Sequence, residues 1–65
     1  MKKLKDVKPG EFFTLKPIPE PKESQVYIRD DYDRSERKYL CYKFNDCNAW
    51  RYFKGDRIVY TDFIF

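Results

Sequence analysis

The sequence predicts a small all-β protein, a five-stranded antiparallel sheet curled into an SH3-like, partly open barrel. Short runs in which apolar and polar residues alternate are typical of strands. Pro, Gly, Asn and Asp stand between these runs, where turns are expected. Aromatic residues that favour strands are abundant, with six Phe, six Tyr and one Trp in 65 residues. No stretch shows a convincing helical pattern, so we expect one domain, residues 1–65, without a helical layer.

The first part of the chain combines a lead-in, a turn, a strand and a loop. In the lead-in, residues 1–8, Leu4 and Val7 are spaced for one helical or 3₁₀ turn. Residues 8–11 (KPGE) have the Pro and Gly positions of a type II turn. The strand predicted over residues 11–16 would turn Phe13 and Leu15 toward the core. The three prolines within residues 17–24 remove backbone donors, which predicts a surface loop.

A long hairpin is predicted from residues 25–30 and 38–45, joined by a polar tip. Alternation places every second residue of both strands in the core and the residues between them outside. The residues expected to face the core are Val26, Ile28, Leu40, Tyr42 and Phe44. The residues expected to face outward are Tyr27, Arg29, Tyr39, Cys41 and Lys43.

The last two predicted strands cover residues 49–54 and 57–65, around a hairpin turn at residues 54–57 (KGDR). The facing of the fourth strand stays open, with Trp50 and Tyr52 on one side and Arg51 and Phe53 on the other. In the fifth strand Asp62 marks the wet face, since an unpaired carboxylate is costly to bury. The core face would then carry Val59, Thr61, Phe63 and Phe65.

The charge and the cysteine content bear on the kinds of ligand and the cellular location that can be expected. The net charge of +3 is too small to indicate nucleic acid by itself. No apolar run is long enough for a membrane span or a secretion signal, so we expect a cytoplasmic protein without a membrane partner. Cys41 and Cys47 are expected to be free thiols, the alternative being a bridge across the turn between them. Two thiols without histidine do not make a zinc site, and no cofactor is expected.

Catalysis has little support in the residues present. The chain has no histidine and two glycines, so a neutral-pH base and a phosphate-binding loop are both missing from the sequence. Residues 31–35 (DYDRS) resemble the start of a calcium loop. However, Glu36 stands where that loop needs Gly and Tyr42 stands where it needs Glu. We therefore expect a non-enzymatic binding module with no metal site.

Two binding surfaces follow from the predicted facing. The first joins outward aromatics to cations, a composition suited to single-stranded nucleic acid or RNA, although nearby aspartates would repel phosphate. Its residues are Tyr27, Arg29, Arg34, Arg37, Tyr39 and Lys43. The second is an apolar patch for a protein partner or self-association, made of Phe12, Ile58, Tyr60 and Ile64. We expect Leu4 and Val7 to cover Ile58 and Ile64; if they do not, this patch is the first choice for a partner.

Three segments carry a resemblance: KPGEFF, with the Leu4 and Asp6 that precede it, YDRS at residues 32–35, and KGDRIVY at residues 54–60. In these the chain resembles small uncharacterised single-domain β proteins of bacterial and mobile-element genomes. The resemblance implies a compact β fold and such an origin, but no activity and no site residues.

Overall fold

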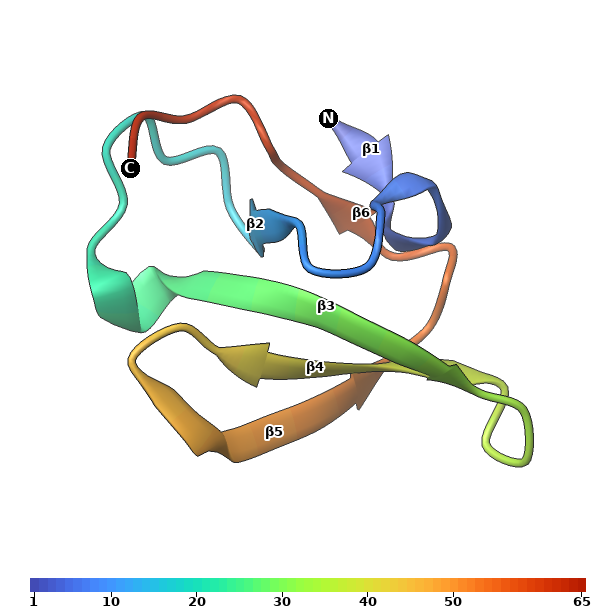
Figure 1. Cartoon of the computed structure of the whole chain (residues 1–65). Coiled ribbons are helices and arrows are strands. Elements are labelled where there is room, and N and C mark those ends of the chain that lie inside the picture. Colours follow the sequence, from blue (N-terminus) through green and yellow to red (C-terminus); the bar gives the residue numbers. More distant parts are fainter.

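The computed structural model describes the backbone of residues 1–65 and every side chain except that of Cys47. Figure 1 shows an all-β chain whose strands form two antiparallel sheets, one of four strands in the order β2-β3-β4-β5 and one of two, β1 and β6. The strands are β1 (Lys2–Lys3), β2 (Phe12–Thr14), β3 (Val26–Asp33), β4 (Lys38–Lys43), β5 (Asp46–Phe53) and β6 (Ile58–Val59). Two 3₁₀ turns, η1 (Leu4–Asp6) and η2 (Glu23–Gln25), precede β2 and β3.

A single bridge connects the two sheets. Thr14 and Tyr60 exchange both backbone hydrogen bonds, at 2.9 and 3.0 Å, so that the chain after β6 lies beside β2. Within the described residues no strand pairing joins β1 to β5, and the sheet is therefore not closed. The all-β antiparallel prediction is confirmed, with six strands in two sheets in place of five in one.

Local turn predictions in the first eleven residues are confirmed. The Val7 amide donates to the Leu4 carbonyl at 3.0 Å, closing the 3₁₀ turn expected from their spacing. The Glu11 amide donates to the Lys8 carbonyl at 3.0 Å across the Pro–Gly pair. Gly10 has a φ of +84°, the left-handed value that a type II turn requires at its third position.

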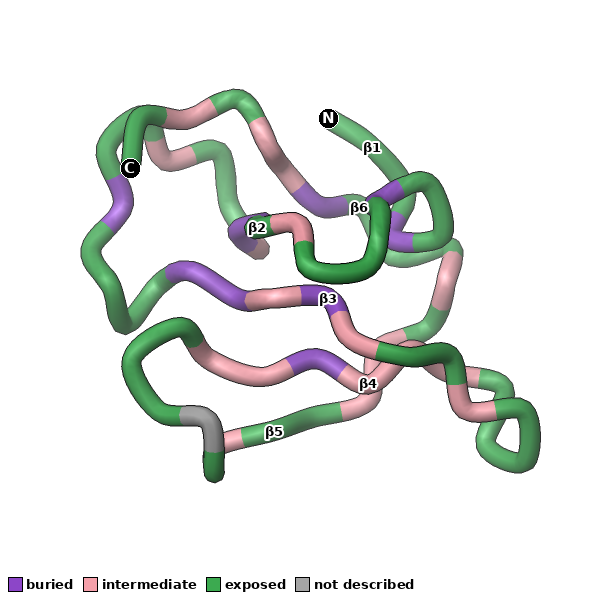
Figure 2. The backbone as a smooth tube through the Cα atoms, in the orientation of Figure 1, coloured by how far each residue is buried: buried purple, intermediate pink, exposed green. Residues whose placement is uncertain are grey.

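The core lies between the four-stranded sheet and the segments η1 and β6. The rings of Phe13, Tyr27 and Phe53 meet at centroid distances of 5.6–6.4 Å, with one stacked pair and two edge-to-face pairs. Aliphatic residues and a thiol complete the cluster, and Figure 2 colours these stretches as buried. They are Leu4, Val7, Cys41 and Val59. Three large aromatic rings allow a chain of this length to form a hydrophobic core.

The facing predicted for β3 and β4 is wrong. Tyr27, Arg29 and Cys41 face inward at 7, 9 and 0% exposure, whereas Phe44 is exposed. Phe13 decides the matter, since it pairs directly with Tyr27, and opposite residues of antiparallel strands share a face. Ile28 and Tyr42 therefore point to the other side, where they are half-buried. Both faces of these strands carry apolar side chains beside charged ones, so alternation alone did not distinguish them.

The charge of Arg29 on the inner face is stabilised by an aromatic ring. Its guanidinium carbon lies 4.4 Å from the centroid of the Tyr39 ring, a cation–π contact. Tyr39, predicted outside, is half-buried and packs against the core. Lys43, also predicted outside, is opposite Tyr27 and half-buried. Val26, predicted inside, is fully buried, but it lies outside the central cluster.

The long closing strand predicted over residues 57–65 is also wrong, since β6 ends at Val59. Beyond Tyr60 the chain runs beside the proline-rich loop, to which the Ile64 amide donates one bond, to the Pro19 carbonyl at 2.9 Å. A loop with prolines at three positions lacks the backbone donors needed to continue a ladder. Val59 is buried as predicted, but Thr61 and Phe63 are half-buried and Phe65 is 50% exposed.

Leu4 and Val7 do not cover Ile58 and Ile64. Both are buried in the core beside Val59, the residue of β6 that faces inward. Ile58 and Ile64 remain 41 and 77% exposed. Cys41 is a free, buried thiol, and the question of a bridge to Cys47 lies outside the described side chains.

Candidate functional site: the outer face of the sheet

The outer face of the four-stranded sheet carries an unbroken row of apolar side chains, one from each strand. Phe12 is opposite Ile28, Ile28 is opposite Tyr42, and Tyr42 is opposite Trp50. We call these four residues the outer row. Trp50 is 56% exposed and Phe12 is 37% exposed, while Ile28 and Tyr42 between them are half-buried. Leu40 and Tyr52, also opposite each other, lie beside the row on the same face.

A cluster of phenylalanines lies at the β2 end of the outer row. The ring of Phe12 meets those of Phe44 and Phe65 edge-to-face, with centroids 5.4 and 5.8 Å apart. Phe44 and Phe65 meet at 4.8 Å in the same manner. Edge-to-face pairs at these distances are favourable beyond the area that they bury. The C-terminal residue is therefore attached to the outer face of the sheet, and the row extends onto it.

An acidic corner lies at the hairpin end of the same face. A hollow of about 280 Å³ is bounded by residues of the β3–β4 hairpin and by Tyr52. Its lining residues are Asp31, Tyr32, Asp33, Arg34, Leu40 and Tyr52. The Tyr52 hydroxyl donates to Asp33 Oδ2 at 3.1 Å, which connects the corner to β5.

The charge at this corner is held in place by hydrogen bonds. Asp33 Oδ1 accepts from the Ser35 hydroxyl at 2.8 Å, the Ser35 amide at 3.0 Å and the Glu36 amide at 3.3 Å. Donation by Ser35, and then by Glu36, holds the pKa of Asp33 below its ordinary value. The same carboxylate accepts a hydrogen bond from the Tyr52 hydroxyl, which raises the pKa of that phenol. Asp33 is therefore a fixed negative charge at neutral pH.

The residues predicted for nucleic acid do not share one surface. Tyr27 and Arg29 are buried on the inner face, and Tyr39 packs there against Arg29. Arg34 and Arg37 are exposed at the hairpin tip. Lys43 lies at the other end of β4. The six residues predicted for nucleic acid are thus divided between the inner face, the hairpin tip and the far end of β4.

The residues predicted for a protein partner are exposed or half-buried, but they are divided. Ile58 belongs to the two-stranded sheet, opposite Lys3. Tyr60 is half-buried beside Thr14, and Ile64 lies beside the proline-rich loop. Phe12 belongs to the outer row. The sequence predicted Tyr42 in the core and did not decide which way Trp50 faces. The pairing of Phe13 with Tyr27 across β2 and β3 puts both Tyr42 and Trp50 on the outer face.

Cys41 has no nucleophilic character in this setting. Its side chain is fully buried, and burial raises the pKa of the thiol to about 11. A thiol at neutral pH is a poor nucleophile, since the thiolate is the reactive form.

None of the described residues belongs to a helix with the length and apolar character needed to cross a membrane. Compared with models of known protein families, with curated proteins and with solved structures, the chain shows no significant match.

Proposed function

We propose that the protein is a non-enzymatic binding module that holds a protein partner on the outer row. The observation that carries the proposal is four adjacent uncharged side chains, two of them large exposed aromatics, across all four strands. A sheet face in contact with water normally carries polar side chains at these positions. A contiguous apolar surface is instead typical of an interaction site.

The partner is an extended protein segment with apolar side chains and one basic residue. Tyr and Trp anchors such as Tyr42 and Trp50 bury well against apolar side chains at the centre of an interface. The acidic corner offers two carboxylates, Asp31 and the hydrogen-bonded Asp33, against one cation, Arg34, at the edge of that contact. A lysine or arginine there would form a charge-assisted hydrogen bond and fix the direction of the segment.

We also propose that the two sheets form an SH3-like, partly open barrel. The Thr14–Tyr60 bridge supports this, since it places β6 next to β2 and continues the sheet toward β1. The Lys5 amide donates to the Gly55 carbonyl at 3.0 Å, and the Leu4 amide donates to the Arg57 carbonyl at 2.9 Å. These bonds bring η1 against the turn after β5, near the open side. A cytoplasmic setting also remains a proposal, as does the bacterial or mobile-element origin that the resemblance implies.

Trp50 provides a direct assay, because it is the sole tryptophan and belongs to the outer row. A displayed library of extended peptides is selected on the purified protein, and binding of the selected peptides is followed by Trp50 fluorescence. We expect alternating apolar residues with one Lys or Arg. Tyr42→Ser should weaken binding at least about tenfold, the effect of losing about 1.4 kcal/mol at an anchor. Each variant must keep the circular dichroism spectrum of the wild type.

Ile58→Ser is the matched control, since it removes an exposed apolar side chain from the other sheet. Its affinity should stay within about twofold of wild type. If Ile58→Ser abolishes binding and Tyr42→Ser leaves the affinity unchanged, the outer row is not the binding site, and the patch around Ile58 is favoured instead. If the protein dimerises in sedimentation experiments and Tyr42→Ser abolishes the dimer, the partner on the outer row is a second copy of this chain and not a different protein.

Single-stranded nucleic acid is the competing ligand class, because the exposed aromatics of the outer row could also stack bases. A titration with single-stranded DNA and RNA separates the two. Micromolar affinity that falls steeply with salt, and is lost in Tyr42→Ser, would overturn the protein partner.

A further inference from the structure

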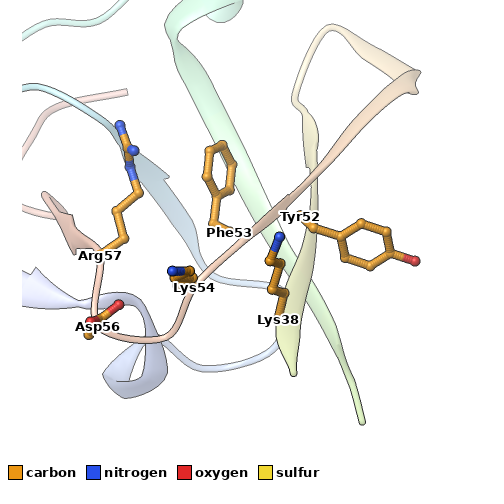
Figure 3. A pocket seen from close by; sticks show the side chains of 6 residues that line it. All are labelled: Lys38, Tyr52, Phe53, Lys54, Asp56 and Arg57. Atoms are coloured by element: carbon orange, nitrogen blue, oxygen red, sulfur yellow. The ribbon is translucent and has the colours of Figure 1, made fainter. Parts of the chain in front are cut away.

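A second hollow lies around the turn between β5 and β6, at the start of β4. Its volume is about 370 Å³, within the lower part of the range found for small-ligand sites. Figure 3 shows the side chains that surround it. They are Lys38, Tyr52, Phe53, Lys54, Asp56 and Arg57.

The hollow concentrates positive charge. Lys38, Lys54 and Arg57 contribute three positive charges to its lining and Asp56 contributes one negative charge. Asp33 lies opposite Lys38 on β3, so the local charge is +1 when Asp33 is included. Like charges around one space repel each other, and an anion between them removes that repulsion. Lys38 comes from β4, whereas Lys54 and Arg57 come from the turn between β5 and β6, so the tertiary fold brings the three cations together.

The turn that carries two of these cations is held in one conformation. The Arg57 amide donates to the Lys54 carbonyl at 3.1 Å. The guanidinium carbon of Arg57 lies 5.3 Å from the centroid of the Phe53 ring, and Phe53 in turn packs against the core. Gly55 between them is close to Tyr39 and bonds to Lys5. The Arg57 guanidinium is thus positioned before any ligand arrives, which lowers the entropic cost of binding.

We propose that this hollow binds the phosphate group of a small anionic ligand. A phosphate offers several acceptor oxygens, which suits a planar guanidinium that donates in pairs together with two lysine ammonium groups. The Tyr52 ring lies at the outer edge of the hollow and extends away from the three cations (Figure 3), so the phosphate is the group that the site would recognise. This site is separate from the outer row, although Tyr52 is near both.

The test is a chemical-shift titration of ¹⁵N-labelled protein at low ionic strength, with pyrophosphate in one arm and ADP in the other. We expect the amides of residues 52–57 and 38 to shift together and to saturate. Tighter binding of ADP would identify a nucleotide-like ligand, and equal binding would identify phosphate alone; both support the site. Shifts scattered over all lysines would overturn it, since they would indicate unspecific attraction of anions.

The double variant Lys38→Gln/Lys54→Gln removes two of the three cations without disturbing the core. Pyrophosphate affinity should fall at least about tenfold, because two charge-assisted hydrogen-bond donors are lost. The matched control is Lys16→Gln/Lys22→Gln, which lowers the net charge equally at exposed positions on or next to the proline-rich loop. Equal losses in the two double variants would refute the site. Peptide binding to the outer row should persist in both, so failure here leaves the proposed function standing.

Discussion

Gly55 is needed for the space that it leaves to its neighbours and not for a positive φ, although its position in a turn suggests the latter. Substitution can test this. Gly10 is the glycine with positive φ, whereas a Cβ added at Gly55 would lie 2.9 Å from Tyr39 Cε2 and 3.3 Å from Lys5 Cβ. Two observations limit the movement of Tyr39. Its ring lies 4.8 Å from that of Tyr32 and is stacked on Arg29 on the inner face. Lys5 is tied to Gly55 by a backbone hydrogen bond of 3.0 Å.

Gly55→Ala is therefore expected to destabilise the protein. A glycine-to-alanine change at an unstrained, open position stabilises by about 0.4–1 kcal/mol, through the unfolded state. Overpacking against a neighbour that cannot withdraw costs about 1–3 kcal/mol. The second effect is the larger, so the net loss should be about 1–2 kcal/mol.

Urea unfolding followed by circular dichroism measures this loss, and a double-mutant cycle with Tyr39→Leu isolates its cause. Leucine at position 39 lacks the Cε2 atom, so Gly55→Ala in that background should cost clearly less, with the 3.3 Å approach to Lys5 Cβ remaining. Gly10→Ala is the control. It has open space around the added Cβ but a φ of +84°, so it should cost about 1–2 kcal/mol in both backgrounds. Equal destabilisation by Gly55→Ala with and without the tyrosine ring would refute the steric explanation.

Three further outcomes are expected. Phe13→Ala should remove about 3–5 kcal/mol, close to the whole stability of so small a domain, whereas Phe65→Ala, at a half-exposed ring, should cost much less in the same thermal melts. In a Cys47→Ser background, Cys41 should react with a disulfide reagent at pH 8 far more slowly than in urea. Rapid reaction without urea would contradict its burial and its pKa of about 11. Because hydrogen bonds lower the pKa of Asp33 in the folded state, its contribution to stability is present above pH 3.8 and is lost as the pH falls through the folded-state pKa. Unfolding midpoints measured between pH 2 and 6 should depend less on pH in Asp33→Asn, and an unchanged profile would count against the Ser35 and Glu36 bonds.

The sequence by itself determined the fold class and the local turns. Leu4 and Val7 predicted a 3₁₀ turn, and the Pro9–Gly10 pair predicted a turn with positive φ; both depend on residues adjacent in the chain. Phe13 was correctly placed in the core, and the apolar runs of β3 and β4 were correctly assigned to strands.

Only the tertiary structure decided which face of β3 and β4 is buried. Both faces carry apolar side chains, so the choice came from pairing: Phe13 opposite Tyr27 puts Tyr27 and Cys41 inside and leaves Tyr42 and Trp50 outside. The length of β6 and the convergence of Lys38 with Lys54 also depend on segments distant in the chain. Both proposed binding surfaces arise in this way, because strand pairing places side chains together that no spacing along the chain relates.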